Sequence, residues 1–157
     1  MASEMVFTMG LPAAGKSTTV AARYATTHNI IDPDMIKESH PDYNPKAPEA
    51  LREWSSECAE QMFAAAIAAG AGCFVVDGTG TNAEKMARRI KRARAAGFSV
   101  RLLYVRCTIE TSFAATRSAH RTVPEFVIRE KARDIATSFE IVAGYVGMDA
   151  VEVANND

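Results

Sequence analysis

The chain has little of several features that mark special classes of protein. It contains three cysteines, an odd number without a Cys-x-x-Cys pair, which excludes a disulfide framework and indicates a reducing compartment. Its longest strongly apolar stretch, residues 62–76, consists mostly of alanine and glycine and is too short to span a membrane. The first five residues carry an acid, Glu4, and lack the basic segment of a signal peptide. We therefore expect a cytoplasmic protein without a membrane partner.

An excess of charge of one sign is also missing from the chain as a whole. It has 18 basic and 19 acidic residues and a net charge of −1, so no overall field attracts nucleic acid or a membrane. Residues 85–101 differ, because they hold seven basic residues and no acidic one. This segment could follow a nucleic-acid backbone or form the solvated face of a helix. Met86, Ile90 and Ala93 form an apolar stripe and no aromatic residues are interleaved, which favours the solvated face.

The pattern of short apolar runs and helical segments predicts an α/β fold. With 157 residues, of which 48% are hydrophobic, the chain has the size and composition of one globular domain. Expected strands lie at residues 5–9, 30–32, 73–77, 98–105 and 149–153, and expected helices at residues 15–27, 49–69, 82–96, 109–119 and 124–145. Strands that alternate with helices are typical of a parallel sheet with helices on both faces. We therefore expect a single domain over residues 1–157 with a parallel sheet of about five strands.

The segment Gly10–Ser17, with the sequence GLPAAGKS, matches the phosphate-binding pattern G-x-x-x-x-G-K-[ST]. It lies between an expected strand and an expected helix, which is the context that phosphate binding requires. In such a loop the glycines let backbone N–H groups point at phosphate oxygens, the lysine reaches the β- and γ-phosphates, and the serine hydroxyl can bind Mg²⁺. The helix that follows presents its positive end to the same anion. We assign ATP binding to Gly10, Ala13, Ala14, Gly15, Lys16, Ser17 and Thr18.

A phosphate-binding loop serves GTPases as well as kinases, and the two classes need different companion residues. Asp77-Gly78-Thr79-Gly80 fits the D-x-x-G pattern of GTPases, but no [NT]KxD pattern for reading guanine occurs in the sequence. A kinase instead needs an acceptor hydroxyl, a carboxylate to take its proton, and cations over the transferring phosphoryl group. Candidates for the carboxylate and the cations are present, so the sequence favours a P-loop domain of the kinase type.

Three aspartates follow expected strands and are the candidate carboxylates. Asp32 and Asp34 come after the second strand, and Asp77 ends the third. Ligands of such sheets bind off the carboxyl ends of the strands, so these side chains can converge near the phosphate-binding loop. Asp34, with Lys37 one helical turn later, is either a general base or the N-cap of a helix that begins at Met35. Beside a phosphate-binding loop we favour the base, and we expect Asp32 to be structural or to bind substrate.

The candidate cations are Arg117 and Arg121, four positions apart and followed by Thr122-Val123-Pro124. If the helix continues, both side chains lie on one face. Arginines in a mobile segment after the fourth strand can close over a phosphoryl group and neutralise its charge, so we place a lid at about residues 108–124. The alternative is a solvated charged face, because several glutamates are nearby: Glu110, Glu125 and Glu130.

This set of motifs resembles the zeta-toxin and polynucleotide-kinase branch of P-loop kinases over almost the whole chain. GLPAAGKS resembles the phosphate loop, and Asp34-Met35-Ile36-Lys37 followed by His40-Pro41-x-Tyr43 resembles the zeta-toxin segment that carries the general base. The run from Phe74 to Gly80 resembles the strand that ends in acid-Gly-Thr-Gly, although many zeta toxins have Glu where this chain has Asp77. Arg121-Thr122-Val123-Pro124, with Arg117 upstream, resembles the end of the lid.

Together the motifs and the resemblance imply an ATP-dependent kinase that phosphorylates a hydroxyl group and uses Mg²⁺. We assign catalysis to Lys16, Asp34, Arg117 and Arg121, acceptor binding to Asp32, Asp34, Lys37, Asp77 and Thr79, and Mg²⁺ binding to Ser17 and Asp77. A protein partner of the antitoxin type is compatible with the resemblance, but the sequence carries no direct sign of one.

The acceptor stays open at this level. The segment from Asp34 to Tyr43 favours a small molecule of the nucleotide-sugar class, which is the reading we prefer. The close spacing of the two lid arginines and the basic residues 85–101 favour a nucleic acid instead. The alternatives are therefore a polynucleotide kinase, acting on a 5′ end or a modified base, and a regulatory module that binds ATP without catalysis.

Overall fold

Strands and helices alternate along the chain, as the sequence pattern predicts. The computed structural model describes residues 3–11, 14–47, 49–118 and 123–156, with the backbone alone at residues 117 and 118. The elements are β1 (Glu4–Met9), α1 (Lys16–Tyr24), β2 (Asn29–Ile31), α2 (Pro33–Glu38), α3 (Arg52–Ala69), β3 (Cys73–Val76), α4 (Ala83–Ala95), β4 (Ser99–Arg106), α5 (Ile109–Ser118), α6 (Glu125–Val146), the 3₁₀ turn η1 (Met148–Ala150) and β5 (Val151–Asn155).

The described strands form one parallel sheet in the order β2-β3-β1-β4-β5. Its central strand is β1, in which Phe7 lies opposite Val76 of β3 and Leu102 of β4. Met5 to Met9 are all buried, because helices cover both faces of the sheet. A strand in such a position needs a continuous apolar run rather than an alternating pattern, which explains the sequence of β1.

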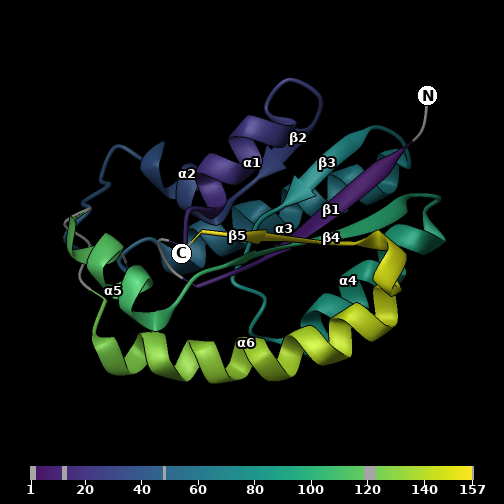
Figure 1. Cartoon of the computed structure of the whole chain (residues 1–157). Coiled ribbons are helices and arrows are strands. Elements are labelled where there is room, and N and C mark those ends of the chain that lie inside the picture. Colours follow the sequence, from purple (N-terminus) through teal and green to yellow (C-terminus); the bar gives the residue numbers. More distant parts are fainter. Residues whose placement is uncertain (1–2, 12–13, 48, 119–122, 157) are drawn as a thin grey trace.

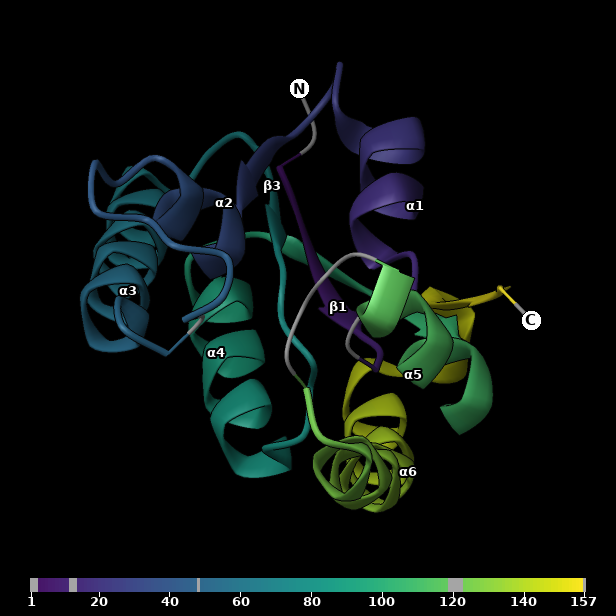
Figure 2. The same cartoon turned by 90° about the vertical axis from the view of Figure 1, so that its left-hand side faces the viewer.

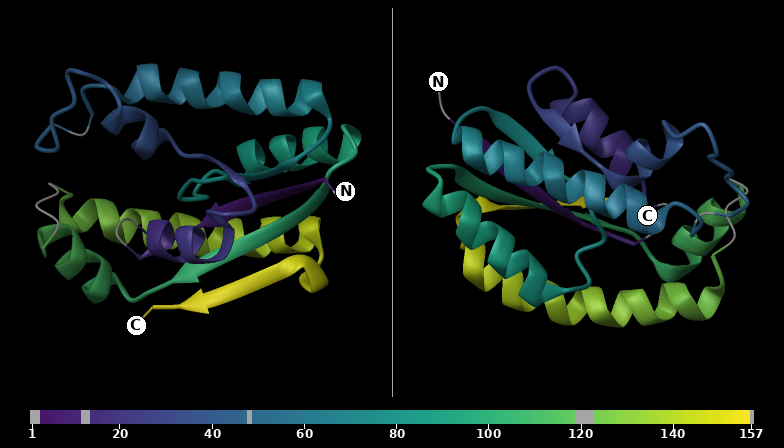
Figure 3. Two further views of the ribbon diagram at one scale, coloured as in Figure 1. Left: turned by 90° about the horizontal axis from the view of Figure 1, so that it is seen from above. Right: turned by 180° about the vertical axis from the view of Figure 1, so that it is seen from behind.

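Helices α3, α4 and α6 lie on one face of the sheet and α1 lies on the other (Figures 1 and 3). The strand order explains this division. The crossover from β1 to β2 runs in the opposite direction to the later crossovers, and a right-handed connection then places its helix on the opposite face. Between the layers, Phe63 of α3 meets Phe7 of β1 edge to face, with 6.3 Å between ring centroids. Ile90 of α4 and Ile128 of α6 are fully buried in the same core.

The carboxyl ends of the strands meet at one edge of the sheet, where α2 and α5 also lie (Figure 1). In Figure 2, which faces this edge, these two short helices stand on either side of the end of β1. The chain leaves β1 toward β2 on one side, and β4 lies on the other side of β1. Parallel sheets bind their ligands at such a reversal of strand order.

Most element boundaries differ from the sequence prediction by a few residues, and one difference affects the site. The helix after β2 begins at Pro33 and not at Met35, and its N-cap is Asp32 rather than Asp34. Proline is well suited to this first helical position, because its missing N–H has no partner there in any helix. Helix α3 begins at Arg52, three residues later than predicted, and ends as predicted before Gly70, which has a φ of 64°.

None of the described helices is both long enough and apolar enough to cross a membrane.

Candidate functional site

The phosphate-binding loop joins β1 to α1, and its first glycine is in close contact with its surroundings. A Cβ atom on Gly10 would lie 2.7 Å from the carbonyl oxygen of Val105 and 3.0 Å from two side-chain carbons of Lys16. The N–H of Gly10 donates a hydrogen bond to the carbonyl oxygen of Thr79, at 3.0 Å. A larger residue at this position would displace the Lys16 side chain or the backbone of β4. Glycine is therefore required here by close packing.

The second glycine starts the helix that follows the loop. Gly15 has a φ of 85°, in the left-handed region that favours glycine, and it is the N-cap of α1. No side chain caps this helix, so its first N–H groups are available to an anion. Ser17 and Thr18 lie in this first turn beside Lys16. The uncapped helix end, with Lys16 beside it, fits the phosphate groups of a nucleotide.

The end of β5 holds the same loop from the other side. The side-chain amide of Asn156 donates a hydrogen bond to the carbonyl oxygen of Ala14, at 2.8 Å, and its backbone N–H donates to Arg106, also at 2.8 Å. A Cβ atom on Gly15 would lie 2.5 Å from this amide nitrogen. Sequence reasoning missed Asn156, because nothing in the local pattern connects it to a loop 142 residues earlier.

The three predicted aspartates gather near Lys16. Asp32 is 4% exposed, and its Oδ1 accepts a hydrogen bond from the backbone N–H of Asp34 at 2.9 Å. Burial and the nearby carboxylates of Asp77 and Asp34 raise the pKa of Asp32 to about 6, although the N–H of Asp34 and the charge of Lys16 act in the opposite direction. The prediction that these carboxylates converge near the phosphate-binding loop therefore agrees with the electrostatics of Asp32.

Because Asp32 caps α2, Asp34 is left for another role. Its side chain is exposed in the first turn of α2, and Lys37 follows one turn later, partly buried. The alternative in which Asp34 is the N-cap is wrong, since the side-chain oxygen that accepts the helix N–H belongs to Asp32.

A buried threonine that sequence reasoning missed organises the end of β3. Thr8 is 1% exposed, and its hydroxyl donates to Oδ1 of Asp77 at 2.6 Å. The hydroxyl oxygen of Thr8 in turn accepts a hydrogen bond from the N–H of Gly78 at 3.0 Å. Thr8 therefore orients the Asp77 carboxylate and the turn that leads to Thr79. Its signal in the sequence is a single polar residue in the apolar run before the phosphate-binding loop.

A lysine of α6 also faces this region, although the sequence offers no local sign of it. Partial burial and the charges of Arg52 and Lys16 lower the pKa of Lys131, while Asp34 and Glu49 oppose the change. Helix α6 thus contributes a cation close to both the phosphate-binding loop and α2.

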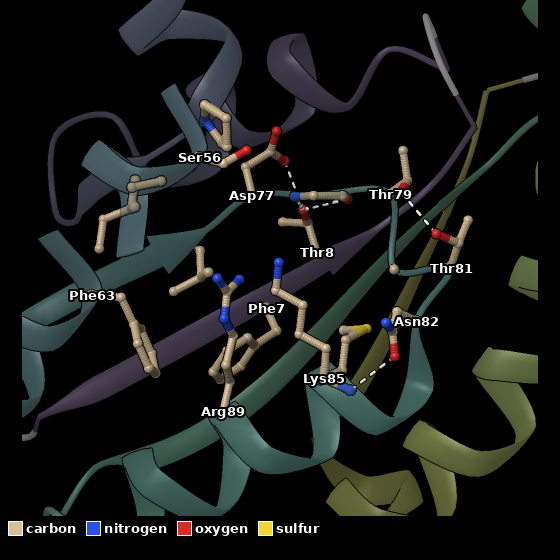
Figure 4. Close-up of a pocket in the computed structure, with 17 residues that line it drawn as sticks. Phe7, Thr8, Ser56, Phe63, Asp77, Thr79, Thr81, Asn82, Lys85 and Arg89 are labelled. Carbon is tan, nitrogen blue, oxygen red and sulfur yellow. Dashed lines mark hydrogen bonds between the residues drawn. The ribbon is translucent and has the colours of Figure 1, made fainter. Parts of the chain in front are cut away.

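A cavity of about 200 Å³ opens beside the aspartates, between the sheet and helices α3 and α4 (Figure 4). Phe7, Phe63 and Val76 give it an apolar wall. Pro33, which lies between Asp32 and Asp34 in the sequence, lines the cavity where it meets α2. Polar groups of the β3–α4 loop and basic groups of α4 complete the lining. These contributors are Asp77, Thr79, Thr81, Asn82, Lys85 and Arg89.

Most of the basic residues between 85 and 101 bond to the protein itself. Arg89 and Arg92 hold the two carboxylate oxygens of Glu60 on α3, at 2.8 and 3.1 Å. Arg94 donates to the carbonyl oxygens of Tyr145 and Val146 at the end of α6. Ion pairs also join Arg88 to Glu84 and Arg101 to Glu4. The interpretation of this segment as a merely solvated face is therefore only partly right, since its arginines tie α4 to α3 and α6.

Among the residues that the structure describes, no group of three or more His, Cys, Asp or Glu side chains is arranged to hold a metal ion.

A comparison with protein-family models matches residues 5–141 to the AAA_33 family, described as an AAA domain. The match covers most of the chain, including the phosphate-binding loop, all three aspartates and helices α1 to α5. The chain belongs to the AAA_33 family. A comparison with curated protein sequences gives no match.

Solved structures similar to this AAA_33 domain confirm the resemblance to zeta toxins and polynucleotide kinases. The PezAT toxin–antitoxin system of Streptococcus pneumoniae matches with a TM-score of 0.74 and 15% identity, over 99% of this chain and 69% of that one. The AvrRxo1-ORF1:-ORF2 complex with ATP matches with a TM-score of 0.76 and 16% identity, over 98% of this chain and 55% of that one. The Pnkp1/Rnl/Hen1 RNA repair complex matches with a TM-score of 0.67 and 13% identity, over 88% of this chain and 45% of that one. The AAA_33 chain thus spans about half the length of the last two proteins.

The family match and the structural similarity establish the fold, which is that of P-loop kinases. This fold implies ATP binding. Several predicted site residues of the AAA_33 domain lie outside what the structure describes. Ala13 and Arg121 are not among the described residues, and for Arg117 the structure gives only a backbone position in α5. The lid at about residues 108–124 and the roles of its arginines stay predictions.

Proposed function

We propose that the chain is an ATP-dependent kinase that transfers the γ-phosphoryl group of ATP to a hydroxyl group of a small molecule of the nucleotide-sugar class. The observation that carries the proposal is the group formed by Lys16, Asp32, Asp34 and Asp77. Within this group Asp77 lines the cavity described above, and Pro33, between Asp32 and Asp34 in the sequence, lines it as well. A kinase needs this combination, because both substrates must meet with water excluded and a proton acceptor at hand.

Asp34 is the proposed general base. Its exposed carboxylate at the start of α2 takes the proton of the acceptor hydroxyl as the acceptor oxygen bonds to the γ-phosphorus. The bond from the γ-phosphorus to the bridging oxygen breaks, and that oxygen leaves with ADP. Lys16 and Lys131 lie where their charges can offset the charge on the moving phosphoryl group. Arg117 and Arg121 are proposed to add to this charge from the lid.

Mg²⁺ is the proposed cofactor, held by the Ser17 hydroxyl and, directly or through water, by Asp77. When bound, it would neutralise phosphate charge and fix the geometry of the phosphates. The chain's own contribution is to orient these ligands. Thr8 fixes one oxygen of Asp77 by a hydrogen bond of 2.6 Å, and α1 presents Ser17 in its first turn.

Two observations support a small acceptor over a nucleic acid. The cavity has a volume of about 200 Å³ and is bounded by α3 and α4, which suits a compact molecule. The arginines that would follow a nucleic-acid backbone are bonded to Glu60, Glu84, Glu4 and the end of α6 instead. An antitoxin-type partner and a cytoplasmic location remain predictions of the sequence.

The substitution Asp34→Asn tests this function, because it keeps the size of the side chain and removes the base. ATP binding, measured by calorimetry, should be unchanged, while phosphoryl transfer from labelled ATP to a panel of nucleotide sugars should fall by about 10²- to 10⁴-fold. Asp149→Asn, at the opposite end of the sheet, is the matched control and should leave both unchanged. Transfer by Asp34→Asn at the wild-type rate would contradict the assignment. Unimpaired ATP binding without transfer in the wild type would favour the regulatory module.

A further inference from the structure

Two lysines of α4, Lys85 and Lys91, differ from the arginines around them, and only Lys85 lines the cavity. The arginines of this segment bond to acids or carbonyl groups, as described above. Among the described residues, none forms a hydrogen bond or an ion pair with the Lys85 side chain; its backbone N–H is bonded to Asn82. The nearest acid, Glu60, has each of its carboxylate oxygens occupied by an arginine. Although partial burial opposes it, these two hydrogen bonds lower the pKa of Glu60 and keep it ionised.

Local structure also disfavours a lysine at this position. Lys85 lies in the first turn of α4, where the helix dipole repels a cation. Arg89 follows at the i+4 position, which adds repulsion between like charges. Partial burial, Arg89 and Arg88 lower the pKa of Lys85, and Glu60 only partly compensates. A residue that conflicts with its local surroundings in several ways is typical of a functional site.

The lysine is directed into the cavity rather than away from the protein. Figure 4 shows Lys85 and Arg89 extending side by side from α4 toward the ends of the strands, with Asp77 on the far side of the cavity. The lining of the cavity is therefore basic along α4, and Asp77 at the end of β3 makes it acidic on the other side. Phe7 and Val76 add apolar side chains to the same lining.

We propose that Lys85 binds an acidic group of the acceptor, either a phosphate or a carboxylate, with Arg89 adding positive charge beside it. This inference rests on the proposed function and deepens it: it assigns the residue that holds the acidic group of the acceptor, which in a nucleotide sugar is the diphosphate. The acidic group lies against α4, and the apolar wall covers the middle of the molecule. The reacting hydroxyl then lies at the opposite end, toward Asp34.

Binding is tested first, with the phosphate-binding loop filled by Mg²⁺ and a non-hydrolysable ATP analogue so that added anions cannot occupy it. Inorganic phosphate and acetate, titrated separately, should shift the NMR signals of the Lys85 side chain and of the Asn82 amide in a saturable way. The anion that binds more tightly shows whether the acidic group of the acceptor is a phosphate or a carboxylate. Lys85→Met should weaken this binding by about tenfold or more, as expected for loss of a charged hydrogen-bond partner. Lys91→Met, on the exposed side of the same helix, is the control and should bind like the wild type.

Catalysis is tested next with matched compounds: glucose, glucose 1-phosphate, glucuronate and UDP-N-acetylglucosamine. The anionic members should be the better acceptors, and Lys85→Met should raise their KM about tenfold or more while changing kcat little. If neither anion binds, or if Lys85→Met binds them as the wild type does, the inference is overturned. If UDP-N-acetylglucosamine is the best acceptor and Lys85→Met leaves its KM unchanged, the inference fails while the proposed function stands; if neutral glucose is the best acceptor, both fail. Lys85-dependent anion binding without transfer to any acceptor would instead overturn the proposed function and leave the anion site.

Discussion

At the scale of single residues, Asp32 combines a structural bond with an unfavourable electrostatic position. Its carboxylate caps α2 through the N–H of Asp34, yet it is buried close to Asp77 and Asp34, which repel its negative charge. The fold holds this conflict in place because β2 and β3 are neighbours in the sheet and end at the same edge. Carboxylates of this kind gather where positive charge is expected to bind.

The stability of the protein should depend on pH through Asp32. The unfolded chain releases this proton near pH 3.8 and the folded protein near pH 6, so the folded state binds more protons between these values. Stability should therefore fall as the pH rises through this window. Asparagine keeps the cap and has no charge, so Asp32→Asn should be more stable than the wild type at pH 7 by about 1–3 kcal/mol.

Denaturant unfolding of both proteins at several pH values between 4 and 7 measures this effect. The difference in unfolding free energy between variant and wild type should grow across the window and then level off. A difference that is the same at pH 4 and pH 7 would show that Asp32 ionises at an ordinary pKa in the folded protein.

At the scale of elements, the end of β5 and the phosphate-binding loop form one unit. Asn156 bonds to the carbonyl oxygen of Ala14 with its side chain and to Arg106 with its backbone. On the other side, Gly10 bonds to the carbonyl oxygen of Thr79. The loop is thus held between the end of β5 and the β3–α4 loop before any ligand arrives. Such preorganisation improves binding because less ordering is required when the ligand binds.

The substitution Asn156→Ala removes one of these two supports. We expect it to weaken ATP binding by up to about tenfold, because a hydrogen bond of this kind contributes about 1 kcal/mol. The stability without ligand should change by about 1 kcal/mol or less. Asn155→Ala, at the neighbouring exposed position, is the control. Calorimetric titration with ATP decides the matter, and equal affinities of Asn156→Ala and Asn155→Ala would show that the loop does not need this bond.

At the scale of the whole molecule, the charged side chains of α4 connect the helices on one face of the sheet. Arg89 and Arg92 of α4 bond to Glu60 of α3 and lie over the ring of Phe63, at 5.4 and 4.9 Å from its centroid. Arg94 of the same helix bonds to the end of α6. The helices on this face of the sheet are therefore linked to one another through α4, and the basic segment contributes less positive surface than its composition indicates.

ATP and Mg²⁺ should stabilise the whole fold, because the loop that binds them is attached to β1, the central strand. At a free ligand concentration of about 100 times Kd, mass action adds about 2.7 kcal/mol. For a protein of this size that corresponds to a rise in Tm of about 5–10 °C. Differential scanning calorimetry with and without the nucleotide measures it. Lys16→Ala should fold but show little of this rise, and a full ligand-induced rise in Lys16→Ala would contradict the assignment of Lys16 to ATP.

The sequence by itself determined the α/β class, the phosphate-binding loop and the convergence of the three aspartates. These features depend on short-range patterns: apolar runs with the lengths of strands, glycines at fixed spacing, and acids directly after strands. The exact start of α2 was missed, because Asp32 and Asp34 are both good caps and only the folded backbone chooses between them.

Only the tertiary structure decided which distant residues support the site. Thr8 meets Asp77 across 69 positions and Asn156 meets Ala14 across 142, because β3 and β4 flank β1 and β5 ends beside the loop. The pairing of the α4 arginines with Glu60, which leaves Lys85 facing the cavity, likewise depends on how α3 packs against α4. Contacts of this kind arise from the packing of whole faces, and no local spacing in the sequence encodes them.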